Sequence, residues 1–493
     1  MSSEYVTHRT FDGHQYTHLF TASDPAGAVA FRADLMEQVL CSPRGAELMQ
    51  AALSGEGSLD SLPREVRDFV TGSTSELPTS GVHSPRCGLG DVASLFLVPT
   101  FDCQLGCEYC RITRTKGRQA GFRLSPEAAR EAIDRVLGLV ADGKRRTLVF
   151  FGGEPLLVPE TVFSAISHVR EGPGGCDTDI MLQTNGVAID AETAEFLAAN
   201  DVFIYLSLDG VADVHNRHRE FLTGEGSHEA SVAGYREAKA HGCCVGVSAT
   251  MTKETGDRFA SSFEAMLSDL LPDKCGAVTH LHPLTAARSP HQCSPGEAAE
   301  ILIQTFLAAR ERGIYHQQMC ERVGPLVTGA WRRYACAGCG GKVVVAPDGK
   351  AGICEYNAGD GRSYVPIHEF SEETVADFLR WAARSPVDTR ECRQCPALPT
   401  CGGGCAYDSQ ELMGNALKFD PWLCETNVQV FHWLMHDLLS QLWHKLTDRD
   451  FHVVTAEERE VVLGGIALDD ALAPIARIIG RSEAAEAAEC PAE

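Results

Sequence analysis

Short apolar segments alternate with longer amphipathic segments between residues 94 and about 312. The apolar segments are rich in Val, Ile, Leu, Phe and Thr and run without polar interruptions, which is typical of strands buried on both faces. They are 94–100, 147–151, 178–184, 202–207, 244–250 and 277–282. The intervening segments open with helix-start signals, for example Ser125-Pro126 and Asp190.

This alternation predicts an α/β fold with a parallel sheet. Six units favour a partial (β/α)6, TIM-like barrel, and an open doubly wound sheet is the alternative. Unusual residues follow the ends of the first four strands. They are Cys103, Cys107 and Cys110, then Gly152, Gly153 and Glu154, then Asn185, and finally Ser207 and Asp209. Because the carboxyl ends of parallel strands meet at one rim, where α/β barrels build their active sites, we expect these residues to lie together.

The two flanks of the barrel have different patterns. Upstream, residues 16–20 and 28–33 are predicted to pair as a hairpin and 33–53 to form a helix, and the Gly/Ser/Pro-rich stretch 71–90 is typical of a linker. Downstream, 430–446 is amphipathic at helical spacing and is predicted to pack on the body of the protein.

Composition limits the classes of function. The chain is 44% hydrophobic and 22% charged, and it has no apolar run near the ~18 residues that a membrane span needs. Its net charge of -24, from 67 acidic and 43 basic residues, argues against a nucleic acid or an anionic membrane as partner. The start "MSSEYVTHRT" has no basic patch followed by an apolar segment, so we expect no secretion signal and a cytoplasmic location.

Twenty cysteines in such a chain indicate metal or redox chemistry rather than disulfides. Cys103, Cys107 and Cys110 offer three thiolates, and an iron–sulfur cube held by three thiolates has one iron with no protein ligand. An iron of that kind can bind a small molecule, as the open position of a catalytic zinc does. The alternative is a zinc site completed by a distant His or Cys, although the x3 and x2 spacings are atypical of zinc knuckles.

These residues resemble a known family. C-x3-C-x2-C with Tyr109 before the last cysteine, directly after a first strand and followed by "GGEP" after the second, resembles the radical S-adenosylmethionine (SAM) enzymes over about 94–312. In that family SAM chelates the open iron through its amino and carboxylate groups, and its reductive cleavage gives a 5′-deoxyadenosyl radical that abstracts hydrogen. The resemblance therefore makes SAM the fourth ligand of the cluster.

The resemblance also implies SAM contacts at eight positions. They are Tyr109 in the cysteine loop, Gly152, Gly153 and Glu154 at the amino group, Ser207 and Asp209 near the carboxylate and ribose, Arg219 at a carboxylate, and Asn185 facing the site. Taken singly, three of them have a plainer interpretation: Asn185 as part of a turn, Arg219 as a surface charge and Asp209 as part of a loop.

A second group of cysteines resembles the SPASM extension of radical SAM enzymes over about 336–425. By the interleaved pattern of that family, Cys336, Cys339, Cys354 and Cys405 would hold one auxiliary [4Fe-4S] cluster and Cys392, Cys395, Cys401 and Cys424 a second. Fully ligated clusters are suited to electron relay. The x2 spacing between Cys336 and Cys339 is shorter than is common in relatives, so the first cluster could be open. A pair of zinc ribbons is the alternative.

The expected organisation has five parts. They are a peptide-recognition-like region and linker (1–92), the radical SAM partial barrel (93–312), a connecting helix (313–335), the SPASM domain (336–430), and C-terminal helices with a tail (431–493). The first part, a small α+β domain, loosely resembles domains that grip precursor leaders by strand addition.

The resemblance implies a peptide-modifying maturase, because SPASM enzymes mostly act on peptides. We expect hydrogen abstraction from a ribosomal precursor peptide that ends in a side-chain cross-link, with a flavodoxin or ferredoxin as electron donor. The stretch 96–114 resembles the maturases paired with His-Xaa-Ser-repeat peptides, close to the cyclophane-forming group.

Two alternative functions remain. An anaerobic sulfatase-maturing enzyme would place a catalytic base directly after Cys354, where this chain has Glu355; that carboxylate could equally be a solvated surface residue. A non-catalytic iron–sulfur electron carrier would leave "GGEP" and the barrel rim without a purpose.

Overall fold

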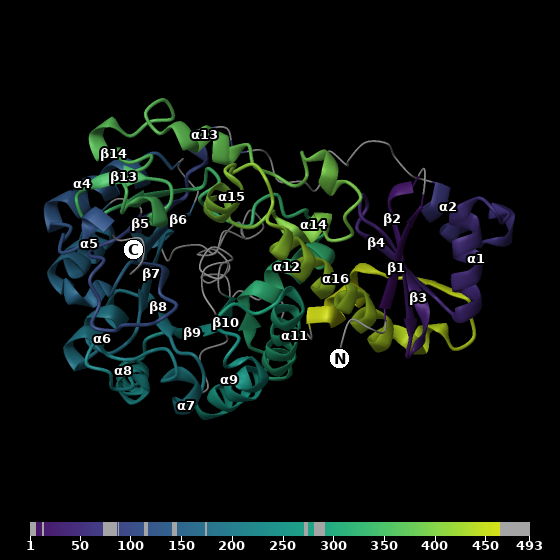
Figure 1. Cartoon of the computed structure of the whole chain (residues 1–493), viewed down its shortest axis with the longest axis horizontal. Coiled ribbons are helices and arrows are strands. Elements are labelled where there is room, and N and C mark those ends of the chain that lie inside the picture. Colours follow the sequence, from purple (N-terminus) through teal and green to yellow (C-terminus); the bar gives the residue numbers. More distant parts are fainter. Residues whose placement is uncertain are drawn as a thin grey trace, which may run out of the picture.

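The structure is a computed structural model. It describes residues 6–11, 14–71, 86, 88–112, 117–140, 145–172, 175–270, 275–280 and 291–463. Figure 1 shows the parallel sheet with its helices on the left and a smaller sheet on the right, joined by the long helix α16. Most of the linker predicted at 71–90 and the tail from 464 onward lie outside the described residues.

Six parallel strands form the centre of the large sheet, neighbouring each other in chain order. They are β5 (Ser94–Leu97), β6 (Arg146–Phe150), β7 (Thr178–Thr184), β8 (Val202–Ser207), β9 (Val245–Met251) and β10 (Cys275–His280). They match the six apolar segments, and the parallel sheet does not close among the described residues. The prediction of a parallel partial barrel is therefore confirmed.

Helices between the strands cover the outside of this sheet (Figure 1). They are α4 (Pro126–Leu137), α5 (Pro159–Glu171), α6 (Ala191–Ala199), α7 (Ala212–His215), α8 (His228–Ala240), α9 (Gly256–Leu270) and α11 (Pro295–Glu311). The predicted starts are confirmed, because the Ser125 side chain accepts from the N–H of Ala128 and the Asp190 side chain from that of Thr193.

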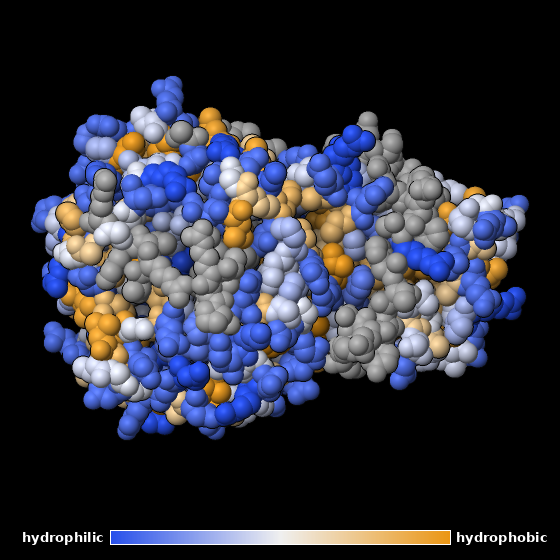
Figure 2. Space-filling model, in the orientation of Figure 1, coloured by the Kyte–Doolittle hydropathy of each residue, from blue (hydrophilic) through white to orange (hydrophobic). Residues whose placement is uncertain are grey.

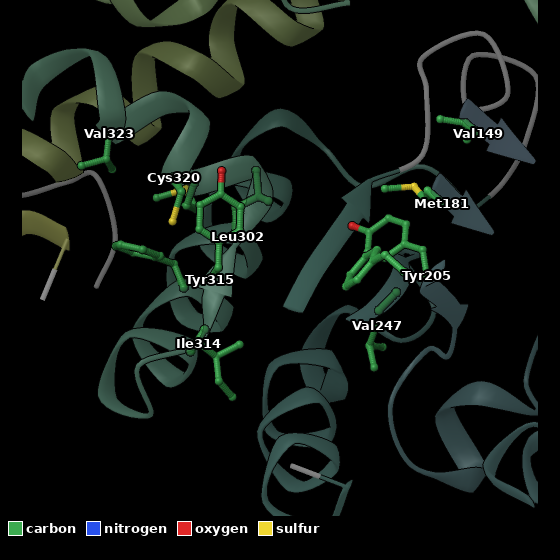
Figure 3. Close-up of a cluster of buried hydrophobic side chains, with 14 of the residues drawn as sticks. Val149, Met181, Tyr205, Val247, Leu302, Ile314, Tyr315, Cys320 and Val323 are labelled. Atoms are coloured by element: carbon green, nitrogen blue, oxygen red, sulfur yellow. The ribbon is translucent and has the colours of Figure 1, made fainter. Parts of the chain in front are cut away.

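One face of the sheet is apolar at its base and polar toward the carboxyl ends. Val149 pairs in register with Met181, whereas further along Ser207 pairs with Ser248. Figure 3 shows Val149, Met181 and Tyr205 on one side and residues of α11, β11 (Tyr315–His316) and α12 (Gln317–Thr328) on the other. The Tyr205 hydroxyl donates to Gln317 at 2.8 Å, so α12 closes against the barrel interior.

The N-terminal part is an antiparallel sheet of five strands. Its strands are β1 (Val6–Phe11), β2 (His14–Ser23), β3 (Ala26–Arg32), β4 (Glu37–Cys41) and β15 (Phe451–Val453), flanked by α1 (Pro43–Ser54) and α2 (Arg64–Thr71). The predicted hairpin is confirmed as β2–β3.

The prediction of helix across 33–53 is wrong for its first part. Residues Val39, Leu40 and Cys41 are fully buried in β4, between β3 and β15. The helix begins only at Pro43, where the Ser42 hydroxyl accepts from the N–H of Gly45 at 3.0 Å. Pairing on both edges outweighs the helical spacing of this segment, and the second partner comes from more than 400 residues away.

The C-terminal helix α16 (Pro421–Leu442) joins the two halves. Its Phe431 ring lies 5.1 Å from Phe31 in the small sheet, and its Trp433 ring lies 5.9 Å from Phe306 in α11. The predicted packing of this helix on the body is therefore confirmed. A short helix, α17 (Ala456–Arg459), follows β15. None of the helices in the described part of the chain is long and apolar enough to span a membrane.

The second cysteine region extends the large sheet. Strand β12 (Lys342–Val345) pairs in parallel with β5, and β13 (Lys350–Gly352) and β14 (Val365–Pro366) add antiparallel strands beyond it. Three helices complete the region: α13 (Ala376–Ala382), α14 (Leu398–Cys401) and α15 (Ala406–Met413). Figure 2 shows that the face in view is largely hydrophilic, as the high net charge leads one to expect.

Candidate active site and cysteine clusters

The loop after β5 carries the first three cysteines, and backbone hydrogen bonds hold it against the loop after α7. The N–H of Gly106 donates to the carbonyl of Glu220 at 2.8 Å. In return, the N–H of Leu222 donates to the carbonyl of Gln104 at 3.1 Å. The loop therefore has a fixed path across the carboxyl rim of the sheet.

The three thiols of this loop face one another. Burial is the main cause that raises the pKa of Cys103 to about 11 and that of Cys107 to about 12, and proximity to Cys110 raises both further. Cys103 also accepts a hydrogen bond from the Asn185 amide at 3.6 Å. Thiols of this kind need a bound metal to ionise, so this donor set fits an iron–sulfur cluster.

Gly152 and Gly153 let the loop after β6 pass directly under the cysteine loop. A Cβ at Gly153 would lie 2.1 Å from the carbonyl oxygen of Asp102, and one at Gly152 would lie 2.6 Å from that of Thr100. Gly152 also has a backbone φ of +136°, a conformation that residues other than glycine rarely adopt. The structure thus brings both glycines to the cysteines, while their contact with SAM stays a prediction.

Glu154 is fully buried and ties two rim loops together. One carboxylate oxygen accepts from the N–H of Leu156 at 3.0 Å and from the Thr184 hydroxyl at 2.8 Å. The other accepts from the N–H of Asn185 at 2.8 Å. Burial raises the pKa of this carboxyl. Three protein donors already use most of its acceptor capacity, so Glu154 fixes the position of Asn185 whatever else it binds.

Asp209 and Arg219 form a buried ion pair, 3% and 8% exposed, so Arg219 is not a surface charge. The Arg219 Nε donates to Asp209 at 2.8 Å, and the Tyr109 hydroxyl and the N–H of Thr250 also donate to this carboxylate. Burial alone would raise the pKa of Asp209, but the charge and hydrogen bond of Arg219 lower it overall. The network links three rim loops and leaves further N–H groups of Arg219 for a ligand.

Ser207 ends β8 and is half-buried. It lies beside Ser248 on the neighbouring strand, on the polar face described above. All eight positions expected to contact SAM therefore lie on the carboxyl rim with the first cysteines.

The second region brings its cysteines together as two sets of four. In the first set, Cys339 and Cys405 have their pKa raised to about 12 and about 11, mainly by burial and then by the neighbouring thiol of Cys336. Cys354 is buried and lies near Cys405. This grouping is the one that the resemblance to SPASM proteins implies.

The second set consists of Cys392, Cys395, Cys401 and Cys424. Burial is the main cause that raises the pKa of Cys392 and Cys395 to about 12, and Cys401 and Cys424 raise both further. The Asn427 amide of α16 donates to the sulfur of Cys401 at 3.2 Å. The long helix thus supplies one thiol and one hydrogen-bond donor to this set.

The spacing of the sulfur atoms argues against zinc. Zinc bonds of ~2.3 Å would hold four sulfurs about 3.8 Å apart in a tetrahedron. Within the described part of the chain, the group of potential ligands whose atoms all lie within 4.8 Å of one another is Glu108, His218 and His291, and it contains no cysteine. No three cysteine sulfurs of the described residues therefore lie as close together as a zinc tetrahedron would hold them.

Two buried arginines near the clusters were missed by the sequence analysis. Arg111 follows Cys110, forms a buried ion pair with Asp408, and stacks on Tyr356 and Tyr407 at 4.3 and 5.0 Å. It therefore links the first cysteine loop to the first auxiliary set. Arg384 donates to the carbonyls of Gly403 and Gly404 at 2.5 and 2.9 Å and so holds the glycine loop before Cys405. Only the placement of Arg111 directly after the motif could have signalled either role.

Glu355 is largely buried and forms an ion pair with Lys342 at 2.8 Å. Burial alone would raise its pKa, but the Lys342 ammonium lowers it overall, so the carboxylate is ionised. The expectation of a solvated surface residue is wrong. Its expected role as a catalytic base is left as a prediction, and the structure gives Lys342 as the partner that any such role must displace.

Comparisons with known proteins show which families have a similar sequence. The model of the radical SAM superfamily matches residues 97–266. The radical SAM cyclopropyl synthase TigE of Paramaledivibacter caminithermalis is 21% identical over 360 residues, covering 68% of this chain and 72% of that protein. The serine-type anaerobic sulfatase-maturating enzyme of Klebsiella aerogenes is 23% identical, covering 64% and 81%.

Solved structures share the fold. The structure of anSMEcpe with bound AdoMet and the Kp18Cys peptide aligns with a TM-score of 0.59 at 20% identity, covering 71% of this chain and 99% of that one. SuiB of Streptococcus suis bound to its precursor peptide SuiA aligns with a TM-score of 0.51 at 12% identity, covering 86% and 99%.

A radical SAM domain holds a [4Fe-4S] cluster and SAM, and Cys103, Cys107 and Cys110 are the residues present that fit the cluster. An electron carrier without catalysis does not account for a radical SAM match that covers the rim loops from the cysteine loop to the end of β9. Residues 97–266 form a domain of the radical SAM superfamily, and the chain that carries this domain is an enzyme.

Proposed function

We propose that this enzyme modifies a ribosomally made precursor peptide, installing a side-chain cross-link of the cyclophane type or similar. The observation that carries the proposal is the division of eleven clustered cysteines into one set of three at the barrel rim and two sets of four beside it. It is supported by TigE, a cyclopropyl synthase, and by SuiB and anSMEcpe, which were solved with peptides bound.

The rim residues have distinct tasks in this proposal. When bound, the cluster and SAM supply hydrogen-atom abstraction from the substrate. Cys103, Cys107 and Cys110 hold the cluster, and Gly152 and Gly153 offer their backbone at the amino group of SAM.

The polar rim residues orient the rest of SAM. Arg219 donates to its carboxylate through the N–H groups that Asp209 does not use, with Tyr109 fixing that pair. Ser207 faces the same side of the sheet, and Glu154 acts through Asn185, whose N–H it accepts.

The two four-cysteine sets act as electron relays in this proposal, because clusters with every iron held by a thiolate have no open position. The ammonium of Lys342 lies near Cys336 and Cys354, and the guanidinium of Arg111 offsets part of the rise that burial causes in the pKa of the Cys405 thiol. Positive charge at this range stabilises a reduced, more negative cluster. Because Cys336 and Cys339 both belong to the first set, we propose that this cluster is fully ligated despite their short spacing.

Peptide capture is assigned to the N-terminal part. Strand β1 forms an edge of the small sheet, and an exposed edge is the place where an extended peptide adds as a strand. A flavodoxin or ferredoxin is the proposed electron donor.

Formylglycine formation is the second candidate, favoured by the sulfatase-maturating relative. In that case Glu355 would be the base and would have to exchange Lys342 for the substrate. The identity of the product separates the two functions.

The test is co-expression with the short open reading frame beside the gene, followed by tandem mass spectrometry of the peptide. Loss of about two mass units without an aldehyde is the expected result for a cross-link. An oxime-reactive aldehyde would support formylglycine instead. An unmodified peptide, from cells in which the enzyme is loaded with iron and cleaves SAM, would contradict both for that substrate.

A further inference from the structure

Two histidines and two glutamates from four segments meet at the cysteine loop, and the rim site described above uses none of these four side chains. Glu108 lies between Cys107 and Cys110, and His218 precedes Arg219. Glu254 follows β9, and His291 precedes α11. No short sequence motif connects these residues, and only the fold brings them together.

Three of the four converge through one atom each. The ligand atoms of Glu108, His218 and His291 all lie within 4.8 Å of one another. One oxygen of Glu108, Oε2, lies 2.9 Å from Nδ1 of His218 and 3.6 Å from Nε2 of His291. Three donors around a common point, two imidazoles and a carboxylate, form the facial set that divalent first-row metals accept.

The far nitrogen of each imidazole is also held. Nε2 of His218 contacts the Thr252 hydroxyl at 3.0 Å and lies 3.7 Å from Glu254. Nδ1 of His291 lies 2.9 Å from the same Glu254 carboxylate. Protein metal sites characteristically orient each ligating histidine by a carboxylate or other acceptor on its second nitrogen. Here a single carboxylate, Glu254, lies near the second nitrogen of both rings, which is the arrangement of a metal site rather than of a simple surface ion pair.

The histidines and the glutamate of the group differ in solvent exposure. The His218 side chain is 2% exposed, its ring lies 4.8 Å from that of His291, and the Glu108 side chain is 56% exposed. The two rings are thus fixed by packing, and the carboxylate leaves one side of the group open to solvent. A bound ion would keep free coordination positions on that side.

We propose that Glu108, His218 and His291 bind one divalent first-row metal ion, with Glu254 as the positioning residue behind both rings. The ion fastens the cysteine loop to the loop after α7 and to the segment just before α11, and Glu254 connects both histidines to the loop after β9. Its open positions face outward, where a carboxylate or imidazole of a ligand could complete the coordination. The site is separate from the cysteine sets and does not depend on which peptide the enzyme modifies.

Mn²⁺ is the probe, because thiolate and sulfide ligands do not favour it and it will not compete for the cysteines. Anaerobically reconstituted full-length protein, stripped with EDTA of loosely held metal, is titrated with Mn²⁺. Free ion is measured by electron paramagnetic resonance. We expect one Mn²⁺ per chain, while the iron content stays constant.

The variants are H291A, E108Q and E254Q, with H241A as the matched control. His241 is a partly exposed histidine that directly follows α8 and pairs with Glu237, and it is not a member of the group. H291A and E108Q should abolish saturable binding, and E254Q should weaken it about 10- to 100-fold, as outer partners of metal ligands do. H241A should bind as the parent does.

Two results would overturn the proposal. One is the absence of a saturable Mn²⁺ site in the parent protein. The other is Mn²⁺ binding that survives both H291A and E108Q. Iron content and circular dichroism of each variant verify that it is folded and loaded, and the readout is metal binding rather than turnover, so failure of the peptide assay leaves it intact.

Discussion

The three-cysteine loop and the two four-cysteine sets are built in opposite ways. The loop lies across the rim of a parallel sheet, and its geometry comes from the strand ends around it, through close backbone contacts at Gly153 and the amide of Asn185. The four-cysteine sets lie in a region with few strands, where the thiols themselves must organise the chain. The sheet thus positions the three-cysteine loop, whereas under our proposal the four-cysteine sets depend more on the clusters that they hold.

The partners of the buried cations also differ between the two kinds of site. At the rim, the buried cation Arg219 is paired with the buried anion Asp209. Near the first auxiliary set, Lys342 and Arg111 are paired too, whereas Arg384 donates to the carbonyl of Gly404 and the hydroxyl of Ser409. Buried cations therefore lie beside both kinds of site, and at the auxiliary sets Arg384 adds hydrogen bonds to the backbone of the loop before Cys405.

The largest expected effect separates the two kinds of cluster. Changing Cys103, Cys107 and Cys110 together to Ala should abolish 5′-deoxyadenosine formation and remove about four of about twelve irons per chain. Iron analysis and chromatography of the nucleoside after dithionite reduction measure both. A parent protein with four irons or fewer would contradict the two auxiliary clusters.

Gly153→Ala should lower the rate of 5′-deoxyadenosine formation about 100-fold, because its Cβ would lie 2.1 Å from the Asp102 carbonyl oxygen and must displace the cysteine loop by a sizeable fraction of an ångström. The matched control is Gly90→Ala, where nothing lies within 4 Å of an added Cβ. Equal rates for the two variants would mean that the rim does not position the loop.

Asp408→Ala should destabilise the protein by about 3–5 kcal/mol, because it leaves Arg111 buried between two tyrosines without its carboxylate. Glu411→Ala removes the carboxylate that pairs with Arg362, whose side chain is 44% exposed, and should cost about 1 kcal/mol or less. Thermal unfolding of both loaded variants gives the comparison, and similar losses would contradict a bridging role for Arg111.

Lys342→Gln should lower the reduction potential of the first auxiliary cluster by about 50–100 mV, the size of a Coulomb interaction of ~1–2 kcal/mol at an effective dielectric constant of ~20. Glu355→Gln, which removes the paired anion, should raise it. Redox titration followed by electron paramagnetic resonance measures both. If only the reduction potential of the SAM-binding cluster shifted, the placement of Lys342 beside the first auxiliary cluster would be wrong.

The sequence alone predicts much of the barrel, because continuous apolar segments and capped helices are local signals. The segments at 178–184 and 202–207 coincide with β7 and β8 residue for residue. The segment 37–41 was assigned to the wrong element, since its burial in β4 depends on pairing with β15 at the far end of the chain.

The candidate site also has features that the sequence predicted and features that only the tertiary structure decided. Cysteine spacing in the sequence identified the clustered thiols, and the family resemblance implied how the eight downstream ones divide into two interleaved sets. The joining of β12 to β5, the ion pair between Arg111 and Asp408, and the meeting of Glu108 with His218 and His291 were decided by tertiary structure. Contacts between segments so far apart leave no periodicity in the sequence, and only packing against a common core brings them within bonding distance.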